Sequence, residues 1–527
     1  MQTSYFSGDN NIRTKLKKTL TSLDKLKLKS ILQNFQKNKL TTNNLCKQEK
    51  KLSLNSKMVK IKAICRDSND YKRKTNTEIE KVYRNTNPKL HPFQKAREYI
   101  RALNSVKLDK IFSKPFLFSL SQPTDCIKVM CKNSKNLGEF ASGGFDGQLI
   151  IWNLSNRKPI FNIKTSHNMI KGLAYSNNAE DILTCGDDNV INFFNKANLY
   201  AQKEAFQTLH STSILENSAD TFPREYRPIT SYNVDGFVEN IDHSFNEKIF
   251  ASSGECISIW NYERNTPLHR FKSCPDGYLK VKFNYTENNI ILGTGYDRTI
   301  TLFDIRTNNP MKQVTLRNKS ACACWNPQEP FNFTVGNEDS NCYTFDMRNL
   351  DKIRMIHKDH ILAVLDIDYS PTGKEFVTGS FDKTIRIFNI NEGFSRECYH
   401  DKRMQKVYSV LYTMDDKYVL SGSDDTNIRV WKAVANDPIK ILNKREEDAR
   451  NYGKKLVEKY KYMPEIKRIR NQKKLPKYII NKKKELRVRQ EAKKNKFKNM
   501  ELNSKPGSLE YNVERIDKIV DSGIVKK

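Results

Sequence analysis

The side chains best suited to chemistry are the cations and tyrosines near the C-terminal end. Residues 443–498 contain 22 Lys or Arg against 7 Asp or Glu, and Tyr460, Tyr462 and Tyr478 lie among the cations. Lysine and arginine bind phosphate oxygens, while aromatic rings stack on unpaired bases. The segment therefore predicts a nucleic-acid contact. The candidate contact residues are Lys454, Lys455, Lys461, Lys467, Arg468, Arg470, Lys473, Lys474, Lys477, Lys482, Lys483, Lys484, Arg487 and Arg489.

The positive charge is unevenly placed along the 527 residues. The formal net charge is +32, yet residues 63–442 carry 50 Lys or Arg against 45 Asp or Glu, and residues 499–527 carry five of each. The other basic flank is residues 1–62, with 15 cations against 3 anions. Such flanks favour a polyanionic partner. Two alternatives stay open: a lysine-rich face that keeps the protein soluble and, for Lys482–Lys484 with Arg487 and Arg489, a nuclear-import signal.

Other reactive residue types give little support for catalysis. His357, Asp359 and His360 have a spacing compatible with metal ligation, but a histidine before a blade's first strand commonly bonds a turn aspartate, and His360 suits that role. We find no Ser/His/Asp set, no phosphate-cradling glycine loop and no suitable carboxylate pair. The sequence predicts no enzyme, no metal and no cofactor.

The elements that must position these residues are seven copies of one repeat, typified by FVTGSFDKTIRIFNI at Phe376–Ile390. Each copy ends in a buried-type aromatic, and the steps between aromatics are 42 or 43 residues, apart from one of 66. This period, with a Gly/Asp turn and a closing aromatic, predicts an all-β, seven-bladed WD40 β-propeller. Six copies carry an aspartate that we assign to the blade turns: Asp146, Asp188, Asp297, Asp339, Asp382 and Asp425.

Local chemistry explains the repeat. Alternation sends Ile385 and Ile387 to one face of a strand and Arg386 to the other. We expect the glycine before each aspartate, such as Gly379, to supply the turn conformation, and the aspartate to accept hydrogen bonds from the turn backbone.

Composition divides the chain into four parts. We predict a low-complexity, disordered extension at 1–57, an N-terminal arm at 58–122, the propeller at 123–435 and a basic C-terminal domain at 436–527. The flanks should be largely helical or extended, with Pro464 and Pro476 dividing the C-terminal helices. The long repeat holds an insertion near Ala201–Arg227, which is either a partner-binding loop or one without a role.

Targeting signals give further expectations. The chain has no run of about 20 apolar residues, so we expect no membrane span. The first residues lack the apolar core of a secretion signal. The scattered cysteines suit buried small hydrophobes in an intracellular protein.

Both flanks resemble a known family. The segment LHPF…REY.RALN…KL…F.KPF (Leu90–Phe116) and the segments YMPEIKRI.RN..LPK (Tyr462–Lys477) and SKPGS (Ser504–Ser508) are similar to the Sof family of WD40 proteins, and the similarity covers about 58–527. Within the first segment, we expect a helix at about 94–112 that packs on the propeller rim. The following KPFLFSL should add the outermost strand of the last blade and close the ring.

The resemblance implies a function. Sof proteins belong to the nucleolar small-subunit processome and associate with the U3 small nucleolar RNA. It implies a non-enzymatic scaffold for pre-ribosomal RNA (18S) processing, monomeric within a large ribonucleoprotein and located in the nucleus and nucleolus. Its partners would be pre-ribosomal RNA, U3 small nucleolar RNA and other processome proteins, without a membrane.

A different function is suggested by two blade endings. FDIR (Phe303–Arg306) and FDMR (Phe345–Arg348) resemble the WDxR endings by which some propellers dock onto the adaptor of cullin-4 ubiquitin ligases, with Phe in place of Trp. Arg306 and Arg348 would then bind the adaptor, and the protein would be a substrate receptor. The simpler interpretation is an ordinary blade end with a surface arginine. A basic cytosolic or chromatin propeller is a third alternative.

Overall fold

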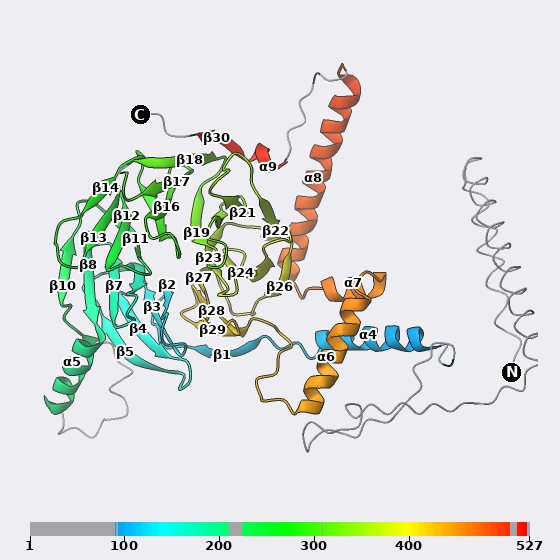
Figure 1. Ribbon diagram of the computed structural model, residues 1–527, viewed down its shortest axis with the longest axis horizontal. Coiled ribbons are helices and arrows are strands. Elements are labelled where there is room, and N and C mark those ends of the chain that lie inside the picture. Colours follow the sequence, from blue (N-terminus) through cyan, green and yellow to red (C-terminus); the bar gives the residue numbers. More distant parts are fainter. Residues whose placement is uncertain are drawn as a thin grey trace, which may run out of the picture. The chain divides into compact units, whose positions relative to one another are not determined.

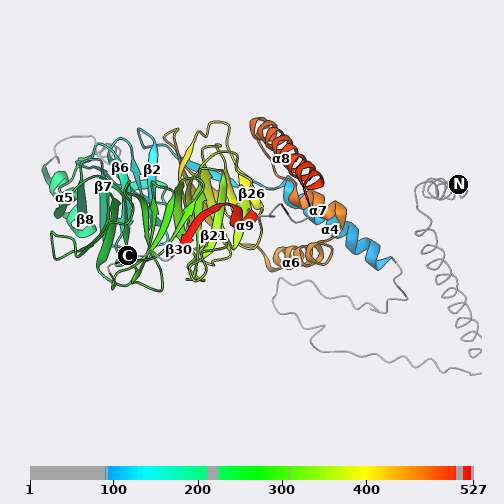
Figure 2. The ribbon, with the colours of Figure 1, turned by 90° about the horizontal axis from the view of Figure 1, so that it is seen from above.

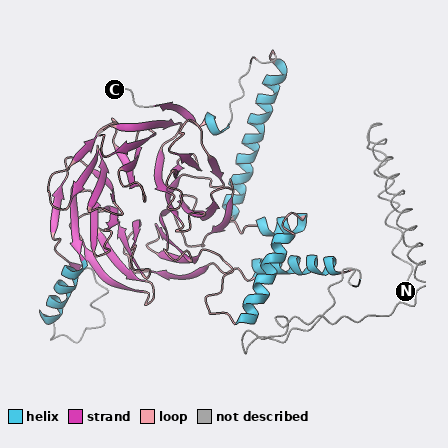
Figure 3. Ribbon diagram, viewed as in Figure 1, coloured by secondary structure: helices cyan, strands magenta, loops and turns pink. Residues whose placement is uncertain are grey.

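Seven β-sheets arranged around an axis form the body of the protein (Figures 1 and 3). The computed structural model describes residues 90, 93–209, 224–307, 309–505, 508 and 514–523. The described residues give each sheet four principal strands, and two sheets gain a fifth strand at the outer edge. The predicted seven-bladed propeller is confirmed. The predicted extension at 1–57, and the arm before residue 90, lie outside the described residues.

The inner half of each blade is an antiparallel pair of strands. The innermost strands, from blade 1 to blade 7, are β2 (Ile127–Lys132), β6 (Ile170–Tyr175), β11 (Val238–His243), β15 (Tyr278–Phe283), β19 (Ser320–Trp325), β23 (Val364–Tyr369) and β27 (Val407–Tyr412). The second strands are β3 (Glu139–Gly144), β7 (Asp181–Gly186), β12 (Ile249–Gly254), β16 (Ile290–Gly295), β20 (Asn332–Asn337), β24 (Glu375–Ser380) and β28 (Tyr418–Ser423).

The outer half carries the repeat's aromatic residue and the blade's edge. The third strands are β4 (Gln148–Asn153), β8 (Val190–Asn195), β13 (Ile257–Asn261), β17 (Thr299–Asp304), β21 (Asn341–Asp346), β25 (Ile385–Asn389) and β29 (Ile428–Lys432). The fourth strands are β5 (Lys158–Lys164), β10 (Thr230–Asn233), β14 (His269–Phe271), β18 (Pro310–Leu316), β22 (Met355–Lys358), β26 (Ser395–Tyr399) and, for blade 7, β1 (Phe116–Leu120).

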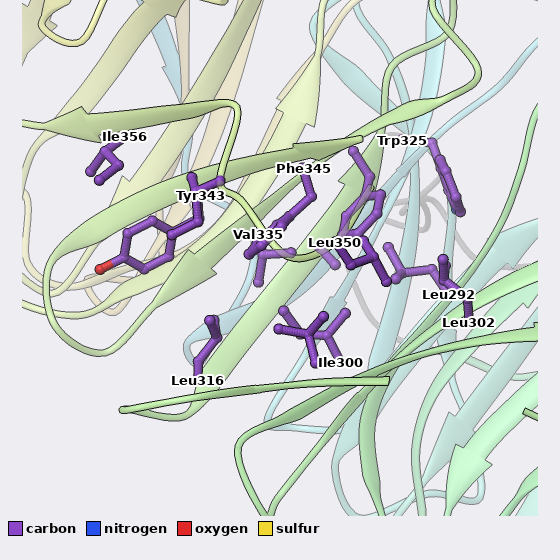
Figure 4. Packing of buried hydrophobic residues seen from close by; sticks show 14 residues of the cluster. Leu292, Ile300, Leu302, Leu316, Trp325, Val335, Tyr343, Phe345, Leu350 and Ile356 are labelled. Atoms are coloured by element: carbon purple, nitrogen blue, oxygen red, sulfur yellow. The ribbon is translucent and has the colours of Figure 1, made fainter. Parts of the chain in front are cut away.

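Apolar side chains between neighbouring blades make the core. The seven repeat aromatics are all buried, and the indole N–H groups of Trp152 and Trp431 donate to Ser142 and Ser421 Oγ on the second strands. Figure 4 shows one such cluster, in which side chains of blade 4 meet Val335 and Phe345 of blade 5. A single blade cannot bury both of its apolar faces, so each blade is covered by its neighbours.

Strand β1 completes blade 7, where the sequence predicts a closing strand. It pairs antiparallel with β29, with Phe118 opposite Val430 and the Phe116 ring 5.5 Å from the Trp431 ring. An N-terminal strand thus joins a C-terminal one. The ring closes without leaving the edge of β29 open.

The blade turns correct the expected role of glycine. The left-handed residue follows the aspartate, as in Lys383 (φ 62°) and Thr426 (φ 64°), and it is mostly not glycine. Gly379 is needed for a different reason, since a Cβ there would lie 2.8 Å from Val407 Cγ1 on the next blade's inner strand. The repeat glycine therefore allows close packing between blades and does not set the turn.

The aspartate of the blade 6 turn is held by a buried histidine. Asp382 accepts hydrogen bonds from Thr384 N at 3.0 Å and His360 Nδ1 at 2.9 Å, while His360 Nε2 lies 2.7 Å from Thr378 Oγ1. Burial lowers the pKa of His360, and the carboxylate of Asp382 opposes this effect. Burial favours the protonated carboxyl of Asp382, but His360, Arg386 and Thr384 outweigh it and lower that pKa to about 2. The predicted role of His360 is confirmed.

Two segments outside the repeats add to blade 1. Helix α5 (Lys196–Leu209) starts the predicted insertion, and strand β9 (Arg224–Glu225) ends it by pairing parallel to β5. Leu199 of α5, just before the insertion, and Tyr226 near its end are both buried in the cluster between blades 1 and 2, so the two ends of the insertion are packed structure. Residues 210–223 lie outside the described residues.

The helices of the two flanks pack together, which corrects the expected place of the N-terminal helix. Helix α4 (Gln94–Ile111) precedes β1, while α6 (Lys444–Lys459) and α7 (Pro464–Asn471) follow β29. Their apolar residues form one small cluster, and Figure 2 shows α4 beside α6 and α7. Its buried members are Ala102, Val106, Leu456 and Ile466. The apolar face of α4 was expected to pack on the propeller rim. It packs on α6 and α7 instead.

The C-terminal chain then returns to the propeller. Helix α8 (Lys477–Asn503) is followed by the short helix α9 (Glu514–Asp517) and strand β30 (Ile519–Gly523). As predicted, prolines separate the helices, since Pro464 begins α7 and Pro476 is the N-cap of α8. None of the helices among the described residues has the length and apolar character of a membrane span.

Acid should reveal the aspartate network of blade 6. Because the folded pKa of Asp382 lies below its unfolded value, its stabilisation is present above about pH 4 and is lost as the pH falls toward 2. We expect Asp382→Asn to lower the free energy of unfolding at pH 7 by at least about 2 kcal/mol. Denaturant unfolding measures the difference in free energy of unfolding between the unchanged protein and this variant. That difference should be about 1 kcal/mol smaller at pH 3 than at pH 7. A gap independent of pH would contradict this account.

Candidate nucleic-acid interface

One carboxylate of the propeller, Asp359, holds the start of the basic C-terminal domain, and its side chain is only 8% exposed. Asp359 lies in the loop between β22 and β23, and its Oδ1 accepts from Lys483 Nζ of α8 at 2.6 Å. Its Oδ2 accepts from Lys473 Nζ at 2.9 Å and from Ser395 Oγ at 2.6 Å, and Arg386 lies 3.4 Å away. Three cations therefore share one anion at the start of α8.

Electrostatics explains why this anchor is stable. Burial raises the pKa of the Asp359 carboxyl, but Arg386, Lys483 and Lys473 outweigh that effect and hold it well below its usual range. The carboxylate is thus ionised at any physiological pH. Removing the Asp359 carboxylate would leave the Arg386 cation buried and without this partner, which lowers stability.

The anchor divides the predicted nucleic-acid contacts into two groups. Lys473 and Lys483 are committed to Asp359, whereas Lys482 and Arg487 make surface pairs with Glu485 and Glu491. Such exposed pairs contribute at most about 1 kcal/mol and yield readily to phosphate. The other predicted cations are exposed on α6, α7, α8 and the segments between them: Lys454, Lys455, Lys461, Lys467, Arg468, Arg470, Lys474, Lys477, Lys484 and Arg489.

Beyond the anchor, the cations of α8 are exposed. Residues 487–503 are all exposed, and the whole helix carries ten Lys or Arg against three Glu. At about 1.5 Å per residue, its 27 residues span about 40 Å. Successive residues are about 100° apart, so this many cations populate most of the helix circumference. The helix offers positive charge to phosphates on more than one side.

The propeller's central lysines are different, because carboxylates on other blades neutralise them. These cross-blade pairs are Lys132–Asp368 at 2.9 Å, Lys280–Asp366 at 3.0 Å and Lys282–Asp242 at 2.6 Å. They link innermost strands around the axis. Among the described residues, exposed positive charge is thus concentrated in the C-terminal domain, which is one of the two basic flanks of the sequence.

After α8, the chain joins blades 4 and 5 at their outer rim. Strand β30 pairs antiparallel with β18 of blade 4, and Arg317 of that blade pairs with Asp517 at 2.7 Å. Lys358 of blade 5 pairs with Glu514, and Ser522 Oγ donates to Asp351 Oδ1 at 2.8 Å. The chain is therefore tied to the propeller at the start of α8 and again at residues 514–523. The sequence pattern did not predict this strand.

Arg306 and Arg348 occupy equivalent places at the ends of third strands in blades 4 and 5. Each guanidinium forms a two-pronged ion pair with the aspartate two residues earlier: Arg306 Nη2 lies 2.9 Å from Asp304, and Arg348 Nη2 lies 2.8 Å from Asp346. The hydrogen bond from Arg306 lowers the pKa of Asp304. The arginine side chains remain 70% and 65% exposed. The ion pairs preset the orientation of both guanidinium groups, and that of Arg348 also lies over the Phe331 ring, 4.6 Å from its centroid.

The remaining predicted site residues have structural places. The six turn aspartates accept hydrogen bonds within or beside their own turns, for example Asp146 from Gln148 N at 3.0 Å and Asp425 from Arg429 Nη1 at 3.0 Å. Asp188 is paired with His167, Asp297 with Thr299 and Asp339 with Tyr343. The described residues contain no group of three His, Cys, Asp or Glu arranged for a metal ion.

Comparison with known proteins matches both parts of the chain. A family model described as "Sof1-like domain" matches residues 433–519, and one described as "WD domain, G-beta repeat" matches 352–389 and 397–432. DDB1- and CUL4-associated factor 13 of Danio rerio is 38% identical over 88% of this chain and 99% of its own. Protein SOF1 of Saccharomyces cerevisiae is 37% identical over 85% of this chain and 89% of its own.

A solved structure also matches. The WD40 β-propeller domain of Doa1 aligns with a TM-score of 0.49 at 15% identity, covering 60% of this chain and 96% of that chain.

The anchor can be tested by removing its charge. We expect Asp359→Asn to loosen Lys473 and Lys483 and to speed amide hydrogen exchange across residues 473–486 by at least tenfold, while β23 and β24 stay protected. Asp401→Asn is the matched control, because Asp401 pairs with Arg429 in the next blade at 3.3 Å. Equal exchange of this segment in both variants would rule out Asp359 as the anchor.

Proposed function

Because this chain belongs to the Sof family of WD40 proteins, we propose that it is a non-enzymatic scaffold of small-subunit ribosome assembly in the nucleolus. Its basic C-terminal domain binds structured RNA, and its propeller holds neighbouring proteins. The single observation that carries the proposal is α8, a cation-rich helix anchored to the propeller at Asp359, whose cations beyond the anchor are exposed.

The energetics of α8 favour a polyanion. Most helical stability in proteins comes from packing of an apolar face, which most of α8 lacks, and the mutual repulsion of its ten cations weakens the helix further. Phosphates placed along the helix remove that repulsion and release condensed counterions, which stabilises the bound state. The anchor at Lys473 and Lys483 fixes the direction of the helix before binding. Because the start of α8 is already held in place, RNA binding has less conformational entropy of this helix to overcome.

The family resemblance narrows the ligand. Sof proteins are tied to pre-ribosomal RNA and the U3 small nucleolar RNA, so we propose these as the RNA partners and 18S processing as the process served. The tyrosines near the cations fit the same ligand. Tyr462 and Tyr478 are exposed and can stack on unpaired bases, whereas Tyr460 is bonded to Glu98 of α4.

The RNA contact can be tested with charge-matched variants. We expect the triple change Lys484→Ala, Arg487→Ala and Arg489→Ala to weaken binding of a pre-ribosomal RNA fragment at least tenfold and to reduce its salt dependence. The control removes three exposed propeller lysines, in Lys164→Ala, Lys248→Ala and Lys272→Ala. Fluorescence anisotropy across a salt series measures the RNA affinity and its salt dependence for each variant. Equal losses in the two triples would mean nonspecific attraction and contradict a contact on α8.

A second candidate function is supported by the paired arginines. Several relatives are named as DDB1- and CUL4-associated factors, and Arg306 and Arg348 are exposed, preset by ion pairs and located on adjacent blades. We propose that they form a docking site for DDB1, which would make the chain a substrate receptor of a cullin-4 ubiquitin ligase. The arginines and α8 are separate features, so the two functions are compatible.

Docking through the arginines predicts a separable defect. Arg306→Ala with Arg348→Ala should lower the affinity for purified DDB1 at least tenfold and leave RNA binding unchanged, because both side chains are exposed and remote from α8 in the sequence. Lys→Ala changes at exposed Lys248 and Lys272 serve as controls. If the arginine variant binds DDB1 as tightly as the unchanged protein, Arg306 and Arg348 are ordinary blade-end residues with no role in docking.

A further inference from the structure

Helix α4 has a second apolar face that the helical cluster does not use. Its inner face contains Ala102 and Val106 and packs on α6 and α7. On the opposite side, a row of large apolar residues is exposed: Phe93 (69%), Ile100 (54%), Leu108 (51%) and Ile111 (67%). Their separations of seven, eight and three residues place them on one face of the helix. We call these four residues the outer stripe.

The charges around the outer stripe all have one sign. Arg97, Arg101 and Lys107 are exposed beside it. The two acidic residues of α4 are engaged elsewhere, since Glu98 accepts from Lys459 Nζ at 2.6 Å and Asp109 accepts from Asn436 Nδ2 at 2.5 Å. The stripe is therefore an apolar surface with a cationic border.

A cleft continues the stripe onto α6. It has a volume of about 260 Å³, and Leu108 and Asp109 of α4 line it together with Ala449, Arg450 and Lys454 of α6. The helices approach closely here, since a Cβ on Gly453 would lie 2.8 Å from Ser105 Oγ. The apolar stripe therefore borders, at Leu108, a cleft that carries the exposed cation Lys454.

We propose that the outer stripe and the α4–α6 cleft bind an amphipathic helix of another protein, with leucine-type residues on one face and acidic residues beside them. Such helices bind through apolar residues at i, i+4 and i+7, and their acidic flanks complement Arg97, Arg101 and Lys107. RNA would use the cations but leave the apolar row in water. A flat lipid surface would leave the cleft unfilled.

The test uses the full chain and two synthetic helical peptides. Both carry leucines at i, i+4, i+7 and i+11, and they differ only in having glutamate or lysine flanks. We expect the glutamate peptide to bind at least tenfold more tightly, by anisotropy at low salt. Ile100→Glu with Ile111→Glu should weaken it at least tenfold, whereas Ile100→Leu with Ile111→Leu should not. Circular dichroism of each variant checks that the exposed substitutions leave the helices folded.

Charge reversal makes the test specific. Arg97→Glu with Lys107→Glu should reverse the preference toward the lysine peptide. Equal binding of the two peptides, or no binding of either, would overturn the proposal. Three other results would also overturn it. The variant Ile100→Glu with Ile111→Glu could change self-association, the affinity for single-stranded RNA or binding to phosphatidylserine vesicles. Each change would identify another occupant of the outer stripe. Because the peptides contact no part of α8, a failure here leaves the RNA proposal standing.

Discussion

Closure of the propeller ring is the constraint on which the arrangement of both flanks depends. The last blade lacks a fourth strand from its own repeat, so β1 must come from the segment before the first blade. Backbone hydrogen bonds from Lys432 N to Pro115 O (2.8 Å) and from Lys114 N to Ala435 O (3.3 Å) hold the incoming and outgoing chains side by side. The helix before β1 and the helices after β29 therefore leave the propeller at one place. Packing of α4 against α6 and α7 follows from that proximity.

The anchor at Asp359 gives the C-terminal domain a direction. A basic helix joined only through a loop would sample many orientations, whereas Lys473 and Lys483 fix the start of α8 on blade 6 and β30 fixes the following chain on blade 4. The same element thus combines a rigid attachment with a fully exposed cationic surface. In an RNA scaffold this combination sets the position of the RNA relative to proteins held by the propeller.

Much of the fold can be predicted from the sequence because its determinants are local and repeated. The spacing of the seven aromatics indicates the blades, and Pro464 and Pro476 mark the helix boundaries. The misplaced features depend on contacts between distant residues. Asp359 pairs with lysines 114 and 124 residues away, and nothing in the loop sequence separates this role from a metal or turn role. The role of Gly379 depends on Val407 in the next blade, and α4 packs on helices more than 340 residues later.

The most direct test of the central claim is to crosslink the full chain to pre-ribosomal RNA with ultraviolet light and to identify the crosslinked peptides by mass spectrometry. The account predicts that crosslinks concentrate in residues 477–503, with others near Tyr462 and in α7. Crosslinks confined to the propeller blades, with none in α8, would contradict it, because the anchored helix would then have no part in holding RNA.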